Sequence, residues 1–362
     1  MKNQLNTIVS NFQTEGIIEN ITQFGDGHIN QTFMVSTKEK IDPDYILQCK
    51  NKNIFKNVPG MMSNIYKVTS HLKKKIIEQN GDPQREAMTI VPTVTGELFY
   101  QDNLGEYWTL YLYIKDNISY EVADTPELAY SGGKGIGKFQ SMVSDLDEPL
   151  IDILPGFHNI RYRFNQWDAV LSKDPVGRKA LVQEEISWIE NRKEEMTAFW
   201  ELVEKQMIPI RVTHNDTKIN NILFDKSGDV LCVIDLDTVL NSTALNDFGD
   251  AIRSYTNTGL EDDPDLNRVS MNIEIFEAFT KGYLEEASKF LTQTEKDYLA
   301  FSAKYITYEQ VLRFLMDYID GDNYYRVKYD NHNLIRTKAQ YKLLQSIEEQ
   351  FCVMNEIVKK YS

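Results

Sequence analysis

The feature that most restricts the fold of this chain is a change in its hydrophobic pattern near residue 115. Before that point one segment, residues 60–78, carries apolar side chains at helical spacing. The remaining apolar runs are short and rich in β-branched and aromatic residues, which predicts strands near residues 17–25, 31–37, 44–50, 89–92, 97–101 and 106–114. The pattern therefore predicts a small lobe of strands with one helix.

After residue 115 the pattern is mainly helical. Helices are expected over residues 125–145, 161–172, 180–206, 270–288, 294–318 and 334–360. One β interruption stands inside this stretch, with strands at residues 210–212, 222–224 and 230–234 around a polar loop. A chain of 362 residues also exceeds the usual size of one domain. We expect an α+β fold with a β-rich N-lobe, residues 1–115, and a larger, mostly helical C-lobe, residues 116–362.

The charge balance restricts the possible partners. The chain has 39 Lys and Arg against 54 Asp and Glu, a formal net charge of −15. Such a surface repels nucleic acid and anionic membranes, so neither is expected as a partner. No apolar run reaches the roughly 18 residues of a membrane span, and the first residues show no apolar signal sequence. These patterns predict a cytoplasmic protein.

The polar loop within the β interruption carries the most specific motif. His214 and Asp216 open it, Asn221 follows Asp216 by five residues, and Asp235 follows Asp216 by nineteen. This spacing matches the phosphoryl-transfer loop of protein-kinase-like enzymes. In that reading Asp216 accepts the proton of a hydroxyl nucleophile. The oxygens of Asn221 and Asp235 suit Mg²⁺, and Lys218 stabilises charge on the transferred phosphoryl group.

Two other strings resemble phosphate-binding or metal-binding motifs and are interpreted differently. Residues 132–138 fit G-x-x-x-x-G-K, but Phe139 occupies the position where a P-loop needs Ser or Thr. We therefore interpret this segment as a glycine-rich surface helix. Asp247 begins an Asp-Phe-Gly string, yet it lies 31 residues after Asp216, and Asp235 already has the expected spacing. Asp247 and Asp250 are expected to brace the polar loop from behind.

The N-lobe offers candidate nucleotide-binding residues by position. Gly25, Asp26 and Gly27 lie in a turn-rich loop between the first two predicted strands. Glycines let backbone N–H groups approach phosphates closely, so this loop is expected to lie over a triphosphate. Ile114, at the end of the last strand, is expected at a hinge beside adenine.

Several of these strings together resemble one known group of proteins. They lie at residues 25–30, 45–48, 211–218, 220–223, 234–238, 247–250, 313–315, 317–318, 321–322 and 324. The chain resembles the aminoglycoside phosphotransferase and choline kinase superfamily, whose members share the two-lobed protein-kinase-like fold. Within it, the chain is similar over nearly its whole length to the N-acetylhexosamine 1-kinases.

This resemblance implies a specific reaction and a set of site residues. ATP, with Mg²⁺, would phosphorylate the anomeric hydroxyl of N-acetylglucosamine or N-acetylgalactosamine. The resemblance gives Asp216 the role of base and Asn221 and Asp235 the role of metal ligands. It also implies that the small-molecule sugar acceptor contacts four side chains, His28, Thr238, Arg313 and Tyr324.

The chain departs from the pattern at two places. Gln48 occupies the position of the strand lysine that contacts nucleotide phosphates in protein kinases, and Lys50 lies on the same strand face as a possible substitute. Ser254 stands where an aromatic residue is expected near the sugar. With Gln48 at the lysine position, the charge of the nucleotide phosphates must be compensated by magnesium and other groups. Ser254 affects the expected preference among sugars and not catalysis.

Two other interpretations remain open from the residues alone. One is a kinase for another small alcohol, such as an aminoglycoside, choline or homoserine; the carboxylates of Asp317, Asp320 and Asp322 would suit a cationic acceptor. The other is a pseudokinase that binds nucleotide without turnover, which Gln48 suggests and which the presence of Asp216, Asn221 and Asp235 opposes. The residue pattern predicts no oligomeric state.

Overall fold

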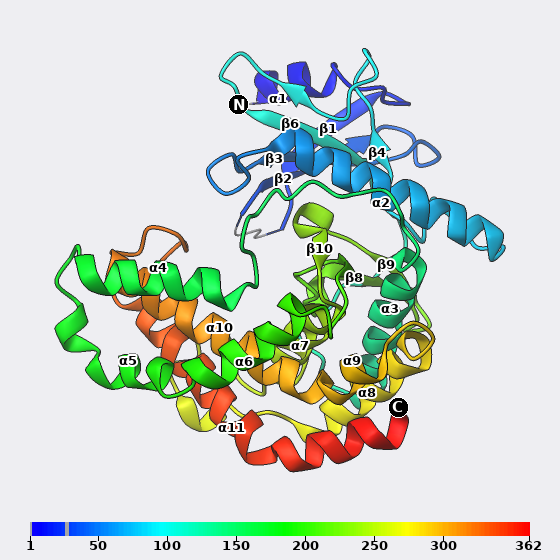
Figure 1. Ribbon diagram of the computed structural model, residues 1–362. Coiled ribbons are helices and arrows are strands. Elements are labelled where there is room, and N and C mark those ends of the chain that lie inside the picture. The colour runs from blue at the N-terminus through cyan, green and yellow to red at the C-terminus, as the bar shows by residue number, and fades with distance from the viewer. Residues whose placement is uncertain (1, 26–28) are drawn as a thin grey trace.

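The computed structural model describes residues 2–25 and 29–362 and has two lobes (Figure 1). The predicted fold class is confirmed: a sheet forms the N-lobe and helices dominate the C-lobe. The N-lobe contains α1 (Lys2–Val9), β1 (Ile18–Gln23), β2 (Gln31–Thr37), β3 (Tyr45–Lys50), α2 (Val58–Glu78), β4 (Ile90–Val91), β5 (Tyr100–Gln101) and β6 (Tyr107–Leu112). Its strands pair antiparallel in the order β1-β2-β3-β6-β4, and β5 also pairs with β6.

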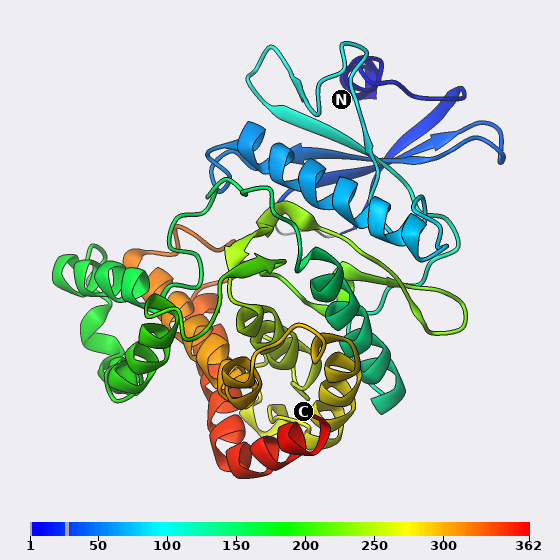
Figure 2. The ribbon, with the colours of Figure 1, turned by 45° about the vertical axis from the view of Figure 1, so that its right-hand side comes forward.

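The two faces of this sheet are covered by different helices. Side chains alternate between the faces along a strand. Leu47 of β3 therefore packs in the cluster that contains Leu5 and Ile8 of α1, whereas Ile46 packs against the cluster of α2. In both ribbon views α2 lies between the sheet and the C-lobe (Figures 1 and 2). The sequence pattern did not predict α1.

The C-lobe combines helices with two short β ladders. Its helices are α3 (Pro126–Val143), α4 (Ile160–Lys173), α5 (Gln183–Glu190), α6 (Lys193–Glu204), α7 (Ala244–Tyr255), α8 (Ile273–Ala287), α9 (Gln293–Asp297), α10 (Leu299–Asp320) and α11 (His332–Tyr361). Its strands are β7 (Arg211–Thr213), β8 (Ile222–Phe224), β9 (Val230–Val233) and β10 (Leu240–Ser242). None of the helices in the described ranges has the length and apolar character needed to cross a bilayer.

Two single helices expected from the pattern are each divided in the structure. The stretch 180–206 contains α5 and α6, which are separated at Asn191 and Arg192. The break directs Arg192 to α11, where its guanidinium pairs with Glu348 at 2.7 Å. Likewise, 294–318 contains α9, which begins with a capping box at Thr292, and the separate α10. Hydrophobic spacing did not locate these breaks because contacts with other helices determine where each segment turns.

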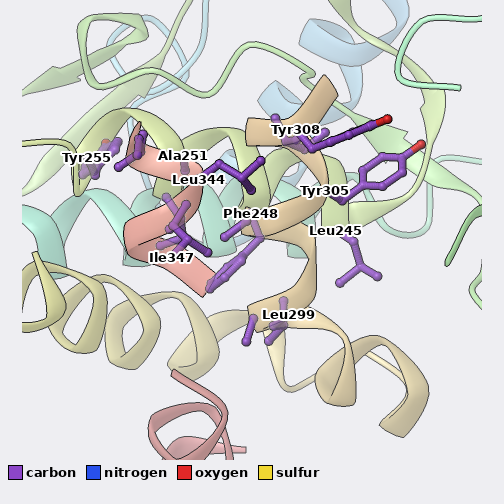
Figure 3. Packing of buried hydrophobic residues seen from close by; sticks show 14 of the residues in the cluster. Leu245, Phe248, Ala251, Tyr255, Leu299, Tyr305, Tyr308, Leu344 and Ile347 are labelled. Atoms are coloured by element: carbon purple, nitrogen blue, oxygen red, sulfur yellow. The ribbon is translucent and has the colours of Figure 1, made fainter. Parts of the chain in front are cut away.

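The core of the C-lobe surrounds α7, a helix that the pattern did not predict. Its Leu245, Phe248 and Tyr255 pack among residues of α10 and α11, as Figure 3 shows. Asn, Asp and Gly are poor helix formers and occupy four of its positions. Those polar residues are buried as well, which brings Asp247 and Asp250 to the polar loop between β7 and β8.

The glycine-rich segment at 132–138 is helical as predicted, but its glycines are not at the surface. It belongs to α3, and Gly132, Gly133, Gly135 and Gly137 are all buried. A Cβ at Gly133 would lie 2.2 Å from the carbonyl oxygen of Phe279 on α8. The glycines therefore permit close contact between α3 and α8. This packing accounts for the G-x-x-x-x-G-K string, and no phosphate-binding role is needed.

Candidate active site

The loop of residues 214–221 is held at both ends by short strands. β7, which precedes the loop, pairs with β10, and β8, which follows it, pairs with β9. Within the loop the Asp216 carboxylate lies 3.1 Å from Nζ of Lys218. Nδ2 of Asn221 donates to the same carboxylate at 3.1 Å. The predicted base, the lysine and one predicted metal ligand are therefore adjacent.

The electrostatics of the loop keep Asp216 ionised. Burial opposes its negative charge, but Lys218 and His214 outweigh burial, so the pKa of Asp216 lies below its ordinary value. The same pairing raises the pKa of Lys218 above its ordinary value. An ionised carboxylate can accept a proton from a hydroxyl group placed within hydrogen-bond distance.

Asp247 and Asp250 of α7 lie behind the loop, as the sequence analysis expected. The Asp247 carboxylate accepts hydrogen bonds from the backbone N–H groups of His214 (3.0 Å) and Asn215 (2.7 Å) and from Nε2 of Gln140 (2.8 Å). Asp250 accepts from the backbone N–H of Thr217 at 2.9 Å. These two buried carboxylates fix the backbone on either side of Asp216.

Replacing Asp247 with alanine is expected to destabilise the protein by about 3 kcal/mol or more, because two buried N–H groups and one amide lose a charged acceptor. Urea unfolding would measure the loss, with the exposed Asp229→Ala as the matched control. An unchanged unfolding midpoint combined with weakened metal binding would instead make Asp247 the metal ligand.

Asp235 and Asn221 provide oxygen atoms suited to a divalent cation. Asp235 follows β9 in a left-handed conformation, φ 58°. Burial and the neighbouring Asp237 raise the pKa of Asp235 to about 6, while Lys50 acts in the opposite direction. Nδ2 of Asn221 also donates to the Asp216 carbonyl at 2.8 Å. Within the described ranges, neither the Asp235 carboxylate nor the Asn221 amide oxygen takes part in a hydrogen bond. Both therefore remain available as ligands.

The protein alone does not form a complete cation cage. No group of three or more His, Cys, Asp or Glu side chains in metal-binding arrangement occurs in the part of the chain that the structure describes. Mg²⁺ typically uses only one or two carboxylates and takes its other ligands from phosphates and water. The donor set at Asp235 and Asn221 fits a magnesium ion that binds together with a nucleotide.

Lys50 is the buried cation of the N-lobe strand, and its partner comes from the C-lobe. Only 1% of Lys50 is exposed, and its Nζ lies 2.7 Å from Oδ1 of Asp237 and 2.6 Å from Oε1 of Gln48. Asn30 donates to the other Asp237 oxygen at 2.7 Å. No carboxylate occurs in α2 before Glu78, so this helix cannot pair with Lys50 in the way that the corresponding helix does in protein kinases.

Of the other predicted nucleotide-binding residues, the structure describes Ile114 and Gly25. Ile114 is buried against Leu223 and Cys232 of the β8–β9 ladder, which gives an apolar surface at the predicted hinge. Gly25 has a φ of 69°, which favours glycine. Asp26 and Gly27, and the predicted sugar ligand His28, lie outside the described residues.

A pocket of about 410 Å³ opens beside Asp216, between the lobes. This volume lies within the range of about 300–1,000 Å³ that is usual for small-molecule sites. The predicted acceptor-binding residues that the structure describes line it together with the loop: Asp216, Lys218, Thr238, Arg313 and Tyr324. Ser254, which replaces an expected aromatic residue, also lines it. Thr238 is partly committed to the loop, since its hydroxyl donates to the His214 carbonyl at 2.7 Å.

Sequence reasoning missed the charged network along the pocket wall. Arg253 pairs with Asp250 at 2.9 Å and with Glu261 at 2.8 Å. All three residues line the pocket, and Arg336 of α11 lies beside them. Asp250 and Arg253 lie three residues apart on α7, but Glu261 follows that helix and Arg336 lies on α11, so no motif associates the four residues. Only Asp250 had been singled out from the sequence, for its position behind the loop.

The carboxylates that suggested a cationic acceptor do not line the pocket. Asp317 accepts from the backbone N–H groups of Tyr324 (2.8 Å) and Tyr325 (2.9 Å), and Asp322 pairs with Arg178. They hold the connection between α10 and α11 in place. The positions of these carboxylates therefore do not support a cationic acceptor.

Comparisons with known proteins agree with this arrangement. A family model described as the phosphotransferase enzyme family matches residues 20–284. One similar solved structure is a spectinomycin phosphotransferase in complex with ADP and spectinomycin, with 15% identity, coverage of 97% of this chain and 98% of that chain, and a TM-score of 0.58. Another is a microcompartment-associated aminopropanol kinase, with 14% identity, coverage of 98% of each chain and a TM-score of 0.62. A choline kinase from Cryptosporidium parvum is similar too, with 15% identity, coverage of 99% of each chain and a TM-score of 0.59. At these identities the similarity to solved structures demonstrates a shared fold.

Proposed function

The chain belongs to the phosphotransferase enzyme family, and from this premise we propose that it transfers the γ-phosphate of ATP to a hydroxyl group of a small acceptor. The observation that carries the proposal is the group formed by Asp216, Lys218 and Asn221, with the oxygen donor Asp235 near Asp216. Asp216 and Lys218 line a pocket large enough for a small molecule.

The proposed step uses Asp216 as the general base. Its carboxylate accepts the proton of the acceptor hydroxyl while that oxygen attacks the γ-phosphorus. The new bond joins the acceptor oxygen to phosphorus, the bond from phosphorus to the β,γ-bridging oxygen breaks, and ADP leaves. Lys218 stays beside Asp216 and stabilises the negative charge of the transferred group.

Charge compensation for the nucleotide is assigned to both lobes. Asp235 and Asn221 would hold magnesium, and the bound ion would compensate the negative charge of the phosphate oxygens. Lys50 pairs with Asp237 of the C-lobe and therefore lies close to Asp235. Its ammonium group supplies the positive charge near the phosphates that the neutral Gln48 cannot supply. These contacts support an active enzyme rather than a pseudokinase.

For the acceptor we propose an N-acetylhexosamine phosphorylated at its anomeric hydroxyl. The pocket offers hydrogen-bonding groups on its wall opposite the N-lobe, notably Arg313 and Gln310. The Arg313 guanidinium lies over the rings of Phe157 (5.5 Å) and Tyr325 (5.5 Å) and forms no ion pair with any described residue. Its planar donors are suited to neighbouring sugar oxygens, and the resemblance to N-acetylhexosamine 1-kinases favours this acceptor.

A panel of acceptors scored for ADP release tests this assignment. We expect turnover with N-acetylglucosamine and N-acetylgalactosamine, and little with choline, aminopropanol, homoserine or aminoglycosides. Phosphorus NMR of the product should show coupling to the single anomeric proton, whereas a 6-phosphate couples to two protons.

Activity confined to amino alcohols or aminoglycosides would reject the sugar and leave the kinase assignment intact. Nucleotide binding without ADP release from any acceptor would instead indicate a pseudokinase. The variant Asp216→Asn is the matched blank for background hydrolysis of ATP.

A further inference from the structure

The pocket beside Asp216 is rich in cations although the protein is strongly acidic. Five cationic side chains line it beside four carboxylates, those of Glu121, Asp216, Asp250 and Glu261. Lys218 pairs with Asp216, and Arg253 pairs with Asp250 and Glu261. Three further arginines line the pocket and form no ion pair with any described residue: Arg313, Arg326 and Arg336. The first of these is assigned above to the neutral part of the acceptor, which leaves Arg326 and Arg336 without a role.

Arg336 is the more informative of the two, because only 6% of it is exposed. It lies in the first turns of α11, and its Nη1 donates to the Arg326 carbonyl (3.3 Å) and to Oδ1 of Asn333 (3.0 Å). Its guanidinium also lies 5.4 Å from the ring of Phe314. These contacts occupy one of its three nitrogens, and both acceptors are uncharged.

The carboxylates closest to Arg336 are engaged elsewhere. Glu261 pairs with Arg253 at 2.8 Å, and Asp262 pairs with Nε2 of His332 at 2.7 Å. Asp317 and Asp322 both accept from Nδ2 of Asn333 at 2.8 Å. Arg336 therefore forms no ion pair with any described residue, although the carboxylates of Glu261 and Asp262 lie nearby.

A largely buried guanidinium without a counter-ion is costly unless something else supplies negative charge. The Arg336 guanidinium contacts the backbone carbonyl of Arg326, and both residues line the pocket. Two guanidinium groups can bind a carboxylate or phosphate through paired, charge-assisted hydrogen bonds. An amine or ammonium group would be repelled at the same place.

We infer that the part of this pocket lined by Arg326 and Arg336 binds an acidic substituent of the acceptor. The preferred acceptor is thus an N-acetylhexosamine that carries a carboxylate or phosphate group away from the phosphorylated hydroxyl. This inference rests on the proposed function of the same pocket, and it specifies the chemical class of the substrate.

The test compares neutral and acidic acceptors with the full-length protein, ATP and Mg²⁺. The neutral acceptors are N-acetylglucosamine and its 6-O-methyl ether, which adds bulk without charge. The acidic acceptors are N-acetylglucosamine 6-phosphate and the 3-O-lactyl ether of N-acetylglucosamine. We expect kcat/KM for one acidic acceptor to exceed that for both neutral sugars by about 10- to 100-fold, the usual effect of charge-assisted hydrogen bonds.

Three variants assign the effect to residues. Arg336→Gln should reduce the preference for the acidic acceptor by about 10- to 100-fold. The exposed Arg326→Gln should reduce it less, by about 3- to 10-fold, and it remains informative if Arg336→Gln does not fold. Lys338→Gln is the matched control: it removes a positive charge from the same helix, but Lys338 pairs with Glu185 and does not line the pocket.

Calorimetric titration of the acceptors, with ADP present, separates this inference from the proposed function. Tighter binding of the acidic sugar without ADP release from ATP would reject the function and retain the acidic subsite. Equal use of neutral and acidic sugars, or a preference unchanged in both arginine variants, would overturn the subsite and retain the kinase. Stimulation of neutral-sugar turnover by free inorganic phosphate, lost in Arg336→Gln, would show a separate anion and overturn the claim that the acid belongs to the acceptor.

Discussion

The Asp216→Asn protein is expected to fold and to bind nucleotide normally while kcat falls by about 10²–10⁴-fold, the usual effect of losing a general base. Asparagine preserves the size of the side chain and its carbonyl oxygen, so Asn221 and Lys218 keep an acceptor. It cannot take a proton from the acceptor hydroxyl. A coupled assay of ADP release gives kcat, and calorimetry with ADP gives nucleotide affinity.

Asp229→Asn is the matched control, because Asp229 is an exposed aspartate in the turn that joins β8 to β9. This control should keep wild-type turnover. Turnover close to wild type in Asp216→Asn, measured with the preferred acceptor, would remove Asp216 from the role of base. A large loss of folding stability would instead assign Asp216 to the support of the loop.

Replacing Asp235 with alanine is expected to abolish detectable turnover at every magnesium concentration that can be tested. Asp235 supplies the carboxylate that we assign to the metal, and Asn221 alone offers only a neutral oxygen. The expected folding stability is close to that of the wild type. Relief of the burial that raises the pKa of Asp235 to about 6 is offset by the cost of about 1–2 kcal/mol for alanine at a φ of 58°. Magnesium titrations of ADP release and urea unfolding measure the two effects.

The contrast with Asp247→Ala makes this prediction specific. Asp247 accepts three hydrogen bonds within the protein, whereas the Asp235 carboxylate accepts none from the described residues. Loss of Asp247 should therefore lower stability, and loss of Asp235 should lower activity. If Asp235→Ala retained magnesium-dependent turnover while Asp247→Ala lost magnesium affinity, the two assignments would be reversed.

Much of the site was predictable because its residues are close together in the sequence. Asp216, Lys218 and Asn221 lie within six residues, and the hairpin that leads to Asp235 shows as two apolar runs around a polar turn. Backbone geometry determines how such neighbours are arranged once the strands have formed. Their spacing therefore singled out the loop, while the ion pair of Asp216 with Lys218 and its hydrogen bond with Asn221 became visible only in the structure.

The partner of Lys50 was not predictable in the same way. The strand pattern placed Lys50 on the face of β3 that carries Gln48, but 54 carboxylates were available as partners. Asp237 is its partner because the segment after β9 packs against the N-lobe, where Leu236 lies in the cluster of α2. The helix α2 itself has no carboxylate before Glu78. Such a contact depends on how the two lobes pack and not on spacing.

The sequence by itself determined the α+β class and the β interruption within the helical C-lobe, because both follow from local hydrophobic periodicity. It also identified the candidate residues of the 214–221 loop, because their short spacing forms a motif. Tertiary structure alone decided where the long helical stretches divide and that the glycines of α3 contact α8. It also decided that Asp317 supports a loop while Arg336 lines the pocket. The physical reason is that burial and ion pairing join residues far apart in the chain, and hydrophobic periodicity contains no information about which distant groups meet.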